Sequence, residues 1–366
     1  MAGTAASYGR LGTGAATALS SSAADSSSCA NTSMPALGLG TFLIIRERIS
    51  AALRSAVLGP GNYRRIDCAP VYFNEDAIGD ALRDEIYGRM PHDGGGGGET
   101  KPLSREDLFL VSKLPGVYMR PEHVEAALRK TLSDLRTDYL DLYLIHWPAP
   151  MRHVPFPPDG YRGWPDEAID DSGDGENLVY DVSVHDTWAA MEDLVASGLV
   201  RRIGVSNFPV ALLHELATRS RVLPFVNQVE IHPYHAQEGL VRYCRARGIA
   251  VQAYSPLGTR GYASMEGAEE PHVLEDPALV GIAVERGVSP AQVALAWAIR
   301  RGMTAVAKSE DPSRQAENMA ACRRGEGSLV ESLTAEEITA ISGLDRGHRF
   351  FRPEEWWGDS AYAVFN

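Results

Sequence analysis

Short apolar, β-branched runs alternate with longer amphipathic stretches from Ala36 onward. Apolar runs of roughly four to eight residues are typical of strands, whereas apolar positions three and four apart indicate a helix with one buried face. Eight runs predict strands: residues 36–42, 63–69, 108–114, 140–147, 200–207, 225–231, 249–255 and 303–309.

Helices are predicted between these runs. In residues 121–135 the apolar side chains fall along one helical face, and Pro121 stands near the start, where its missing N–H costs little. Residues 186–198 begin at an Asp, which can cap a helix, and end at Gly. Residues 288–302 offer Ser289 and Pro290 at their start. Strands and helices therefore alternate along the chain.

This alternation predicts an α/β fold. Eight strands, each followed by a helix, favour a closed parallel (β/α)8 TIM barrel. The competing fold, a doubly wound sheet, usually carries G-x-G-x-x-G between its first strand and first helix. Gly38 and Gly40 begin that pattern, but position 43 is Leu. We therefore expect residues 34–366 to form one barrel.

Three segments depart from the alternation. Residues 1–33 hold nine Ala, eight Ser and two charges, which predicts a flexible extension. A transit peptide is the alternative, although a single Arg gives it little support. Residues 88–102, with five consecutive glycines, are interpreted as a flexible connector. Residues 152–181 are a long acidic loop after the fourth strand, either part of an active-site rim or a solvated excursion.

Composition and charge narrow the function classes. Hydrophobic residues make up 44% and charged residues 23%, close to the globular average, which excludes disorder or a fibrous fold for most of the chain. The net charge of −13 argues against nucleic acid as the main partner. No apolar run approaches the roughly 20 residues of a membrane-spanning helix, so none is expected.

The cysteines predict a reducing compartment. Four are present, and they show neither metal-binding spacing nor the density of a disulfide framework. They are Cys29, Cys68, Cys244 and Cys322. We expect no metal site and a cytoplasmic protein, or an organellar one if residues 1–33 are a transit peptide.

Polar residues gather at the predicted carboxyl ends of the strands, where barrel enzymes carry out their chemistry. Asp67 ends the second strand and Lys113 the third, so the two are natural partners, because a buried charge needs one. Tyr72 follows Asp67 by five positions, and His146 ends the fourth strand. An inert ion pair closing the barrel is the alternative for any one of these residues, but it explains the whole set poorly.

A tyrosine beside a Lys–Asp pair suits acid catalysis. The Lys113 ammonium stabilises phenolate and is expected to lower the pKa of Tyr72 from about 10. Tyr72 would then protonate a developing oxyanion, while a neutral His146 hydrogen-bonds the same oxygen. No nucleophile or metal-binding motif accompanies them, which favours carbonyl reduction with hydride from a cofactor.

Seven segments resemble the aldo-keto reductase family, in order and at matching spacing. They are residues 61–79, 108–114, 141–148, 203–208, 226–233, 251–258 and 307–318. The resemblance runs from about Met34 to Asp345 and implies a (β/α)8 barrel that binds NADPH, with NADH possible, and has no Rossmann motif. It implies reduction of aromatic, aliphatic and aldose aldehydes to alcohols by a monomer or weak homodimer.

The resemblance also implies a role for each matching residue. Tyr72 would donate the proton, Asp67 and Lys113 would tune it, and His146 would orient the substrate carbonyl. Phe42 and Trp147 would line the substrate pocket. The cofactor-binding residues would be Thr41, Ser206, Asn207, Gln228, Tyr254, Ser255, Leu257, Lys308, Ser309, Arg314, Glu317 and Asn318.

Within that set, the resemblance separates two ends of the cofactor. Ser206, Asn207 and Gln228 would hold the nicotinamide carboxamide, with the Tyr254 ring stacked beneath the nicotinamide. Thr41, Ser255 and Leu257 would line the pyrophosphate path, and Glu317 and Asn318 would face the adenine. Lys308, Ser309 and Arg314 would grip the 2′-phosphate, because an Arg fork with a Lys point charge suits a phosphomonoester.

Several positions depart from the family pattern. Cys68 stands where Ser or Thr is usual and is interpreted as a small buried residue. Phe42 and Pro115 stand where Trp is common, which leaves substrate preference open. Glu310 and Asp311 add negative charge beside the expected 2′-phosphate pocket, which leaves strict NADPH selectivity open.

The tail resembles that of xylose and mannose-6-phosphate reductases over residues 349–360. In the family this segment folds over the barrel mouth, so Trp356 or Trp357 would complete an aromatic wall; the alternative is that it simply covers the barrel end. A second function class also stays open, because some related barrels, such as potassium-channel β subunits, keep the same four residues and act mainly as partner subunits.

Overall fold

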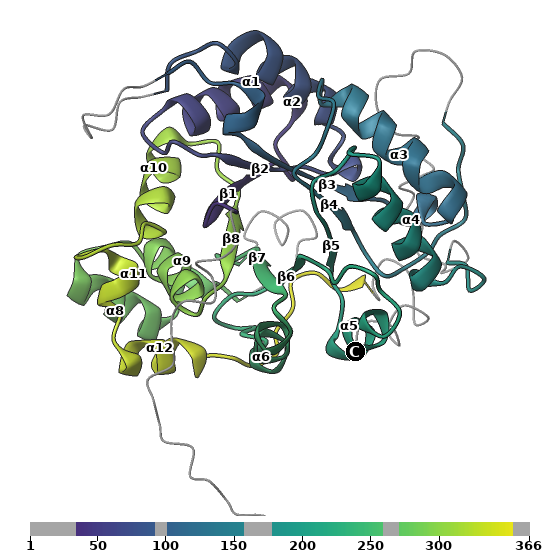
Figure 1. Ribbon diagram of the computed structural model, residues 1–366. Coiled ribbons are helices and arrows are strands. Elements are labelled where there is room, and N and C mark those ends of the chain that lie inside the picture. Colours follow the sequence, from purple (N-terminus) through teal and green to yellow (C-terminus); the bar gives the residue numbers. More distant parts are fainter. Residues whose placement is uncertain (1–33, 92–100, 157–177, 259–270, 354–366) are drawn as a thin grey trace, which may run out of the picture.

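The computed structural model describes residues 34–91, 101–156, 178–258 and 271–353 (Figure 1). The predicted extension at residues 1–33, the centres of the two predicted insertions and the candidate wall residues Trp356 and Trp357 lie outside these ranges.

Eight parallel strands form a closed barrel in which each strand pairs with the next and β8 pairs with β1 (Figure 1). The strands are β1 (Leu37–Gly40), β2 (Arg65–Asp67), β3 (Phe109–Leu114), β4 (Leu142–Ile145), β5 (Ile203–Ser206), β6 (Val226–Glu230), β7 (Ala250–Tyr254) and β8 (Thr304–Ala307). Each lies inside one of the eight predicted runs, so the predicted fold class is confirmed. The runs are longer than the strands because their apolar pattern continues into the adjoining turns.

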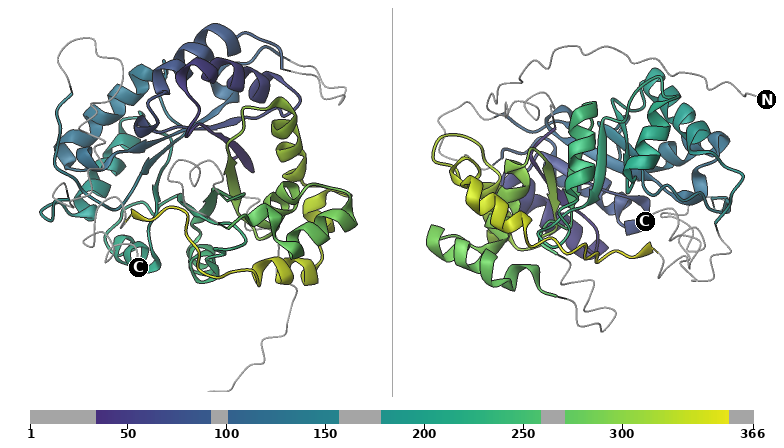
Figure 2. Two further views of the ribbon diagram at one scale, coloured as in Figure 1. Left: turned by 180° about the vertical axis from the view of Figure 1, so that it is seen from behind. Right: turned by 90° about the horizontal axis from the view of Figure 1, so that it is seen from below.

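Helices surround the barrel, as the views from behind and below also show (Figure 2). They are α1 (Arg46–Leu53), α2 (Glu75–Ala81), α3 (Pro121–Asp134), α4 (Val184–Ala196), α5 (Val210–Ala217), α6 (Glu238–Arg247), α8 (Pro277–Arg286), α9 (Pro290–Arg300), α10 (Pro312–Ala321), α11 (Leu329–Ser332) and α12 (Ala335–Ser342). The last three follow β8, and the chain then runs back across the barrel.

The structure agrees with one of two predicted helix caps and differs from the other. Helix α9 begins after Ser289, whose hydroxyl accepts from the N–H of Gln292 as a capping box. The predicted start of α4 at Asp186 is wrong. Ser183 is the cap, because its hydroxyl accepts from the N–H of His185 at 3.1 Å, and the helix begins one residue later.

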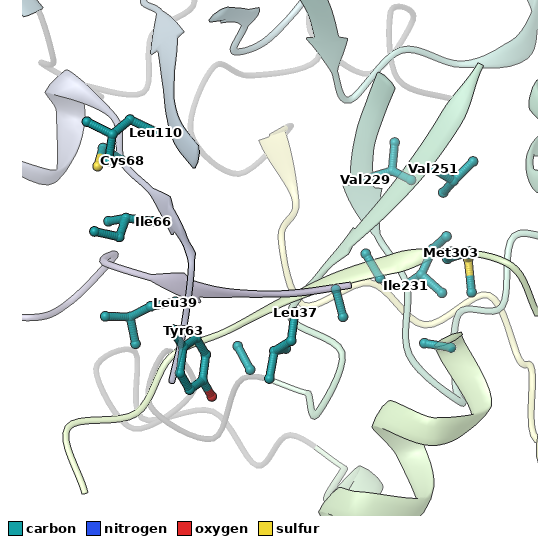
Figure 3. Close-up of a cluster of buried hydrophobic side chains, with 14 of the residues drawn as sticks. Leu37, Leu39, Tyr63, Ile66, Cys68, Leu110, Val229, Ile231, Val251 and Met303 are labelled. Atoms are coloured by element: carbon teal, nitrogen blue, oxygen red, sulfur yellow. The ribbon is translucent and has the colours of Figure 1, made fainter. Parts of the chain in front are cut away.

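The outward side chains of the strands pack against the helices in one continuous apolar core. Figure 3 shows part of it, with residues such as Leu39 on β1, Ile66 on β2 and Val251 on β7. Trp188 and Trp297 are among the largest fully buried side chains of the core. This layer holds the helices on the barrel wall.

The inner side of the barrel carries a smaller apolar cluster. It consists of Met34, Phe109, Val111, Leu142, Leu144 and Val226. Because strand side chains alternate between faces, the inner faces of β3, β4 and β6 continue from these residues to Lys113, His146 and Gln228. The apolar cluster therefore supports a polar layer at the carboxyl ends of the strands.

No helix within the described ranges is long and apolar enough to cross a membrane. The described cysteines, Cys68, Cys244 and Cys322, are free thiols and buried. The described ranges also hold no group of three or more His, Cys, Asp or Glu residues arranged to bind a metal ion.

Candidate active site

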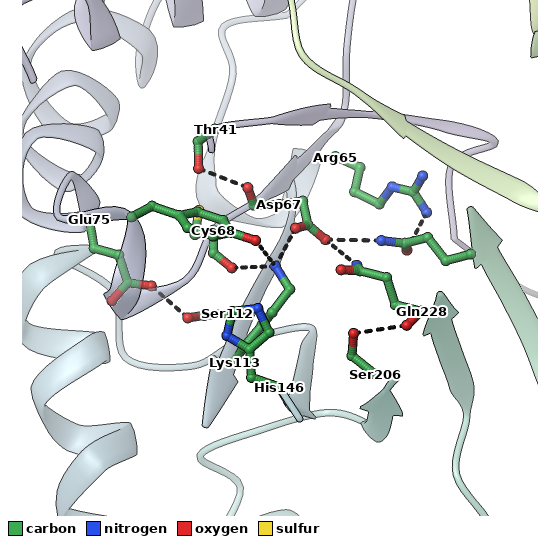
Figure 4. Close-up of polar contacts among 12 residues, drawn as sticks. Thr41, Arg65, Asp67, Cys68, Glu75, Ser112, Lys113, His146, Ser206 and Gln228 are labelled. Carbon is green, nitrogen blue, oxygen red and sulfur yellow. Dashed lines mark hydrogen bonds and ion pairs between the residues drawn. The ribbon is translucent and has the colours of Figure 1, made fainter. Parts of the chain in front are cut away.

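Lys113 is the centre of the predicted site. Its fully buried ammonium forms an ion pair with Asp67 and donates to the Tyr72 hydroxyl at 3.1 Å (Figure 4). It also donates to the backbone carbonyl of Cys68 at 2.9 Å. The predicted Lys113–Asp67 pair is thus present, and Tyr72 joins it directly.

A short turn places Tyr72 over this pair. After β2 the chain enters the 3-10 turn η3 (Pro70–Tyr72), which opens with a proline that suits a first helical position. The Tyr72 N–H donates to the Ala69 carbonyl at 3.0 Å, and Phe73 ends the turn at φ 55°. The Lys113 nitrogen consequently lies 4.8 Å from the centre of the Tyr72 ring.

The predicted direction of the Tyr72 pKa is wrong. Burial raises the pKa of Tyr72 above its usual value of about 10, and this outweighs the lowering by the nearby Lys113 charge. Burial also opposes the charge on Lys113, but attraction to Asp67 and Tyr72 prevails and raises the pKa of Lys113. The site therefore holds a neutral phenol beside a firmly charged ammonium at neutral pH.

His146 lies beside Tyr72 on the neighbouring wall of the site. The two ring centres are 6.0 Å apart and the planes meet at 82°. Burial, and then repulsion from Lys113, lowers the pKa of His146 well below its usual value of about 6.5. The imidazole is therefore neutral, the form that the sequence analysis required for hydrogen bonding to a substrate oxygen.

Asp67 receives hydrogen bonds from deeper in the barrel as well. Gln228 and Gln252 each donate a side-chain N–H to Asp67 Oδ2, at 2.7 and 2.9 Å. Gln228 was expected among the cofactor-binding residues, whereas Gln252 and its partner Arg65 were missed. Their signal in the sequence was a polar residue two positions before a site residue on the same strand face, at Arg65 before Asp67 and at Gln252 before Tyr254.

Asn207 connects three strand ends on the expected nicotinamide side. Its side chain donates to the His146 carbonyl at 2.9 Å and to the Ser206 hydroxyl at 3.1 Å, and it accepts from the Tyr254 hydroxyl at 2.9 Å. Ser206 in turn donates to the Gln228 carbonyl at 2.8 Å. Asn207 adopts φ 64°, a left-handed conformation that Asn tolerates better than most residues. The structure thus brings together the residues that were expected to hold the nicotinamide carboxamide.

The expected 2′-phosphate residues lie at the end of β8 and the start of α10. Lys308 is exposed and pairs with Glu310 at 2.7 Å, and Glu310 also accepts from Arg48 at 3.1 Å. Asp311 caps α10 by accepting from the N–H of Arg314 at 2.9 Å. Glu310 therefore already pairs with the Lys308 ammonium, and Asp311 already accepts from the Arg314 N–H. Both donors would otherwise be available to an anion.

The other predicted cofactor residues differ in accessibility. Thr41 is fully buried and donates to the Asp67 carbonyl at 2.9 Å, and Asn318 is buried close to Tyr63. Ser309 is buried too, with its hydroxyl accepting from the N–H of Asp311 at 3.1 Å. By contrast, Glu317 is exposed. The partly buried residues are Ser255 and Leu257.

Phe351 is a site residue that the sequence analysis missed. Its ring centre lies 5.4 Å from that of Tyr254 and 6.1 Å from that of Phe42, which itself lies 5.1 Å from Tyr72. A pocket on the Tyr254 side of Phe351 is lined by Trp147 and Asn207 among others, and its lining includes neither Phe42 nor Tyr72. The sequence predicts an aromatic contribution from the tail, but from Trp356 or Trp357, which lie outside the described residues.

Glu230 at the end of β6 holds this part of the tail. Its buried carboxylate accepts from the N–H of Phe350 at 2.8 Å and from the N–H of Phe351 at 3.2 Å. A third contact comes from His232 Nε2 at 3.0 Å. The tail is therefore fixed to the barrel by its backbone, and the Phe351 side chain is left to face the site.

Comparison with known proteins agrees with this geometry. The profile of the Aldo/keto reductase family matches residues 36–345. Aldo-keto reductase family 1 member A1 of Mus musculus is 38% identical over 320 residues, which cover 87% of this chain and 89% of that protein. The Bos taurus protein of the same name is 40% identical over 322 residues, with the same coverage.

Solved structures show the same architecture. The aldose reductase from Schistosoma japonicum superposes with a TM-score of 0.71 at 33% identity, covering 91% of this chain and 96% of that one. The aldose reductase from Giardia lamblia superposes with a TM-score of 0.71 at 36% identity, covering 88% of this chain and 96% of that one. With its closed barrel and its Asp–Lys–Tyr–His cluster, this chain belongs to the aldo/keto reductase family of nicotinamide-nucleotide-dependent oxidoreductases.

Proposed function

We propose that this protein reduces aldehydes to alcohols with NADPH, and that Tyr72 is the general acid. The observation that carries the proposal is the buried Lys113 ammonium, which contacts both the Asp67 carboxylate and the Tyr72 hydroxyl. Neutral His146 beside them completes a site that can stabilise and protonate an oxyanion. The substrates would be aromatic, aliphatic and aldose aldehydes.

The residues present fit a nicotinamide nucleotide. Side-chain amides of Asn207 and Gln228 with the Ser206 hydroxyl offer the donors and acceptors that a carboxamide needs, and the Tyr254 ring offers a flat surface beside them. The exposed Lys308 suits a phosphate. When bound, the reduced nicotinamide supplies the hydride.

Tyr72, Lys113 and His146 would together transfer the proton to the substrate oxygen. Lys113 donates to the Tyr72 oxygen, which leaves the phenolic O–H free to point toward a substrate carbonyl. As that proton leaves, the fully buried ammonium beside it stabilises the phenolate. Neutral His146 can donate to the same carbonyl oxygen without adding a charge. The raised Tyr72 pKa keeps this proton in place until negative charge develops on the substrate.

The test is Tyr72→Phe, which deletes the donor and keeps the ring. We expect kcat for a simple aldehyde to fall by about 10²–10⁴-fold. The Kd for NADPH, measured by protein fluorescence, should change little, because the cofactor contacts remain. Tyr243→Phe is the matched control, since Tyr243 lies in the outer helical layer on α6, where its hydroxyl contacts His214 Nδ1 of α5 at 3.3 Å.

Two outcomes would count against the proposal. A Tyr72→Phe enzyme that keeps most of its kcat removes Tyr72 from the role of proton donor. Tight NADPH binding by the unaltered protein without oxidation of NADPH by any aldehyde in a panel would instead favour a partner-subunit function.

Preference for NADPH is proposed to rest on Lys308 and Arg314. Arg314→Ala should weaken NADPH binding by about 1.5–3 kcal/mol, the scale of a hydrogen bond to a charged group, and leave NADH binding unchanged. Glu310→Gln should instead strengthen NADPH binding, because the Glu310 carboxylate pairs with Lys308 and competes with a phosphate for it. Equal changes for both nucleotides would show that these residues do not contact the 2′-phosphate.

The substrate pocket is proposed to favour apolar aldehydes. Phe42 and Phe351 extend from Tyr72 toward Tyr254 as a row of aromatic rings. Burial against such a wall favours aromatic and medium-chain aldehydes, whereas aldoses would depend on scattered hydrogen bonds and show a higher KM. Phe351→Ala should lower kcat/KM for benzaldehyde relative to that for an aldose. An unchanged ratio in a folded variant would mean that the tail only covers the barrel end.

A further inference from the structure

A second cation lies inside the barrel, below the site. Arg65 precedes Asp67 by two positions on β2, so both side chains are on the inner face of the strand. Arg65 is fully buried and is the third largest of the fully buried side chains. A buried guanidinium is costly unless its N–H groups are paired, so its surroundings show what it does.

The barrel makes room for this guanidinium at Gly38 on β1. A Cβ at that position would stand 2.5 Å from Arg65 Nε, closer than any non-bonded contact allows. From β8, Arg65 is held by the Thr304 hydroxyl at 3.2 Å and by the Ala305 carbonyl. Three strands thus position the group at one depth in the barrel.

Its remaining contact leads to the catalytic cluster. Arg65 donates to the Gln252 Oε1 at 3.0 Å, and Gln252 Nε2 donates to Asp67 Oδ2 at 2.9 Å. A guanidinium only donates and a carboxylate only accepts, so the amide between them has one satisfactory orientation. Arg65 therefore holds Gln252 with its N–H directed at Asp67.

The charges around this relay are few. Burial lowers the pKa of Arg65 to about 10, with opposing attraction from Asp67, so the group stays charged at neutral pH. The Cys322 thiol is the other titratable group that acts on Arg65. Lys113, Asp67 and Cys68 are those that act on Tyr72. Among the described residues, Asp67 is thus the carboxylate that acts on both the Arg65 and the Lys113 cations.

We propose that Arg65 is a positioning residue for the proton donor, acting through Gln252 to fix the Asp67 carboxylate that holds Lys113 against Tyr72. Without Arg65, the Gln252 amide can turn, Asp67 loses a directed donor, and the Lys113–Tyr72 contact loosens. The alternative is that Arg65 only fills the barrel interior. The inference rests on the proposed role of Tyr72, but its contacts can be tested without turnover.

The experiment compares Arg65→Met and Gln252→Met with Arg64→Met. Arg64 is the matched control because it is the neighbouring arginine but donates to the backbone carbonyls of Val57 and Tyr63 instead. Tyrosine labelled with ¹³C at Cζ reports the environment of each phenol, and the Tyr72 signal is the one absent in Tyr72→Phe.

We expect the Tyr72 signal to shift in both relay variants and to stay in place in Arg64→Met. The kcat for an aldehyde should fall by about 10- to 100-fold in the relay variants, the scale of a misplaced catalytic group. The Kd for NADPH should stay within about twofold of the unaltered protein, since no cofactor contact is removed.

The outcomes separate the two proposals. A folded Arg65→Met protein with an unshifted Tyr72 signal and unchanged kcat overturns the positioning role; if that variant does not fold, the same result in Gln252→Met does so. If the unaltered protein reduces no aldehyde, the proposed function fails, and the Tyr72 signal alone then decides whether the relay exists.

Discussion

The two sides of the barrel wall differ in chemistry. Outside, the strands and helices share one continuous apolar core that includes Trp188 and Trp297. Inside, a cluster of six buried apolar residues supports a column of polar side chains. That column runs through Arg65, Gln252, Asp67, Gln228, Lys113 and Tyr72.

The outer apolar core and the inner polar column are expected to respond differently to substitution. In the outer core each side chain contributes by the apolar area it buries, and a change is felt mainly where it leaves a cavity. In the inner column each polar group depends on a partner, because an unpaired buried charge is costly. A substitution inside should therefore lower both activity and stability, whereas one outside should lower stability alone.

The strongest test of the inner column is Lys113→Met. It removes the ammonium that Asp67 and Tyr72 share, so we expect kcat to fall by about 10²–10⁴-fold. It also leaves Asp67 buried without its cation, which should lower the free energy of unfolding by about 3–5 kcal/mol. Steady-state kinetics and urea denaturation measure the two effects.

Arg129→Met is the control for that experiment. Arg129 also pairs with a carboxylate, Glu125, but on the exposed face of helix α3, where a pair contributes about 1 kcal/mol or less. If the two variants lost similar activity, the distinction between the inner column and the outer layers would be wrong.

Trp297→Ala tests the outer core. Trp297 is fully buried on α9, and its indole N–H donates to the Ser342 hydroxyl at 3.0 Å. We expect the free energy of unfolding to fall by about 3–5 kcal/mol, from lost burial and the cavity left behind. The kcat of the folded fraction should stay within about twofold, because no inner contact is changed. Trp297→Phe should lose less stability, and a large loss of kcat in either variant would contradict the comparison.

Glu75 is a polar exception in the outer layer, and its effect on stability is expected to depend on pH. On α2, it accepts from the Ser112 hydroxyl at 2.5 Å and from the Thr131 hydroxyl at 3.2 Å. Burial raises the pKa of Glu75 to about 8, opposed in part by the Ser112 hydrogen bond. The folded protein therefore binds a proton that the unfolded chain has released between about pH 4.5 and 8.

Stability should consequently fall as the pH rises through this window, by at most about 1.4 kcal/mol per pH unit for this group. Glu75→Gln cannot ionise, so its Tm relative to the unaltered protein should increase from pH 5 to pH 8. Glu122→Gln, an exposed change on α3, should show no such trend. A parallel pH dependence of the unaltered protein and Glu75→Gln would exclude Glu75 as the cause.

The sequence by itself determined the barrel and the strand ends at which the candidate site residues lie. Strand and helix periodicities are local, and the parallel order then places strand ends such as those at Asp67, Lys113 and His146 at one rim. Capping was less certain, because Ser183 and Asp186 are both good caps three residues apart and only the backbone contact chooses between them.

Tertiary structure decided whatever depends on depth or on distant segments. The direction of the Tyr72 pKa follows from a balance between burial and the Lys113 charge, and the sequence shows the charge but not the depth. Phe351 reaches Tyr254 because Glu230, 121 positions earlier, holds its backbone. Arg65 is paired from β7 and β8, and it fits because β1 carries Gly38 beside it. Such contacts have no local signature, since chain folding alone brings their partners together.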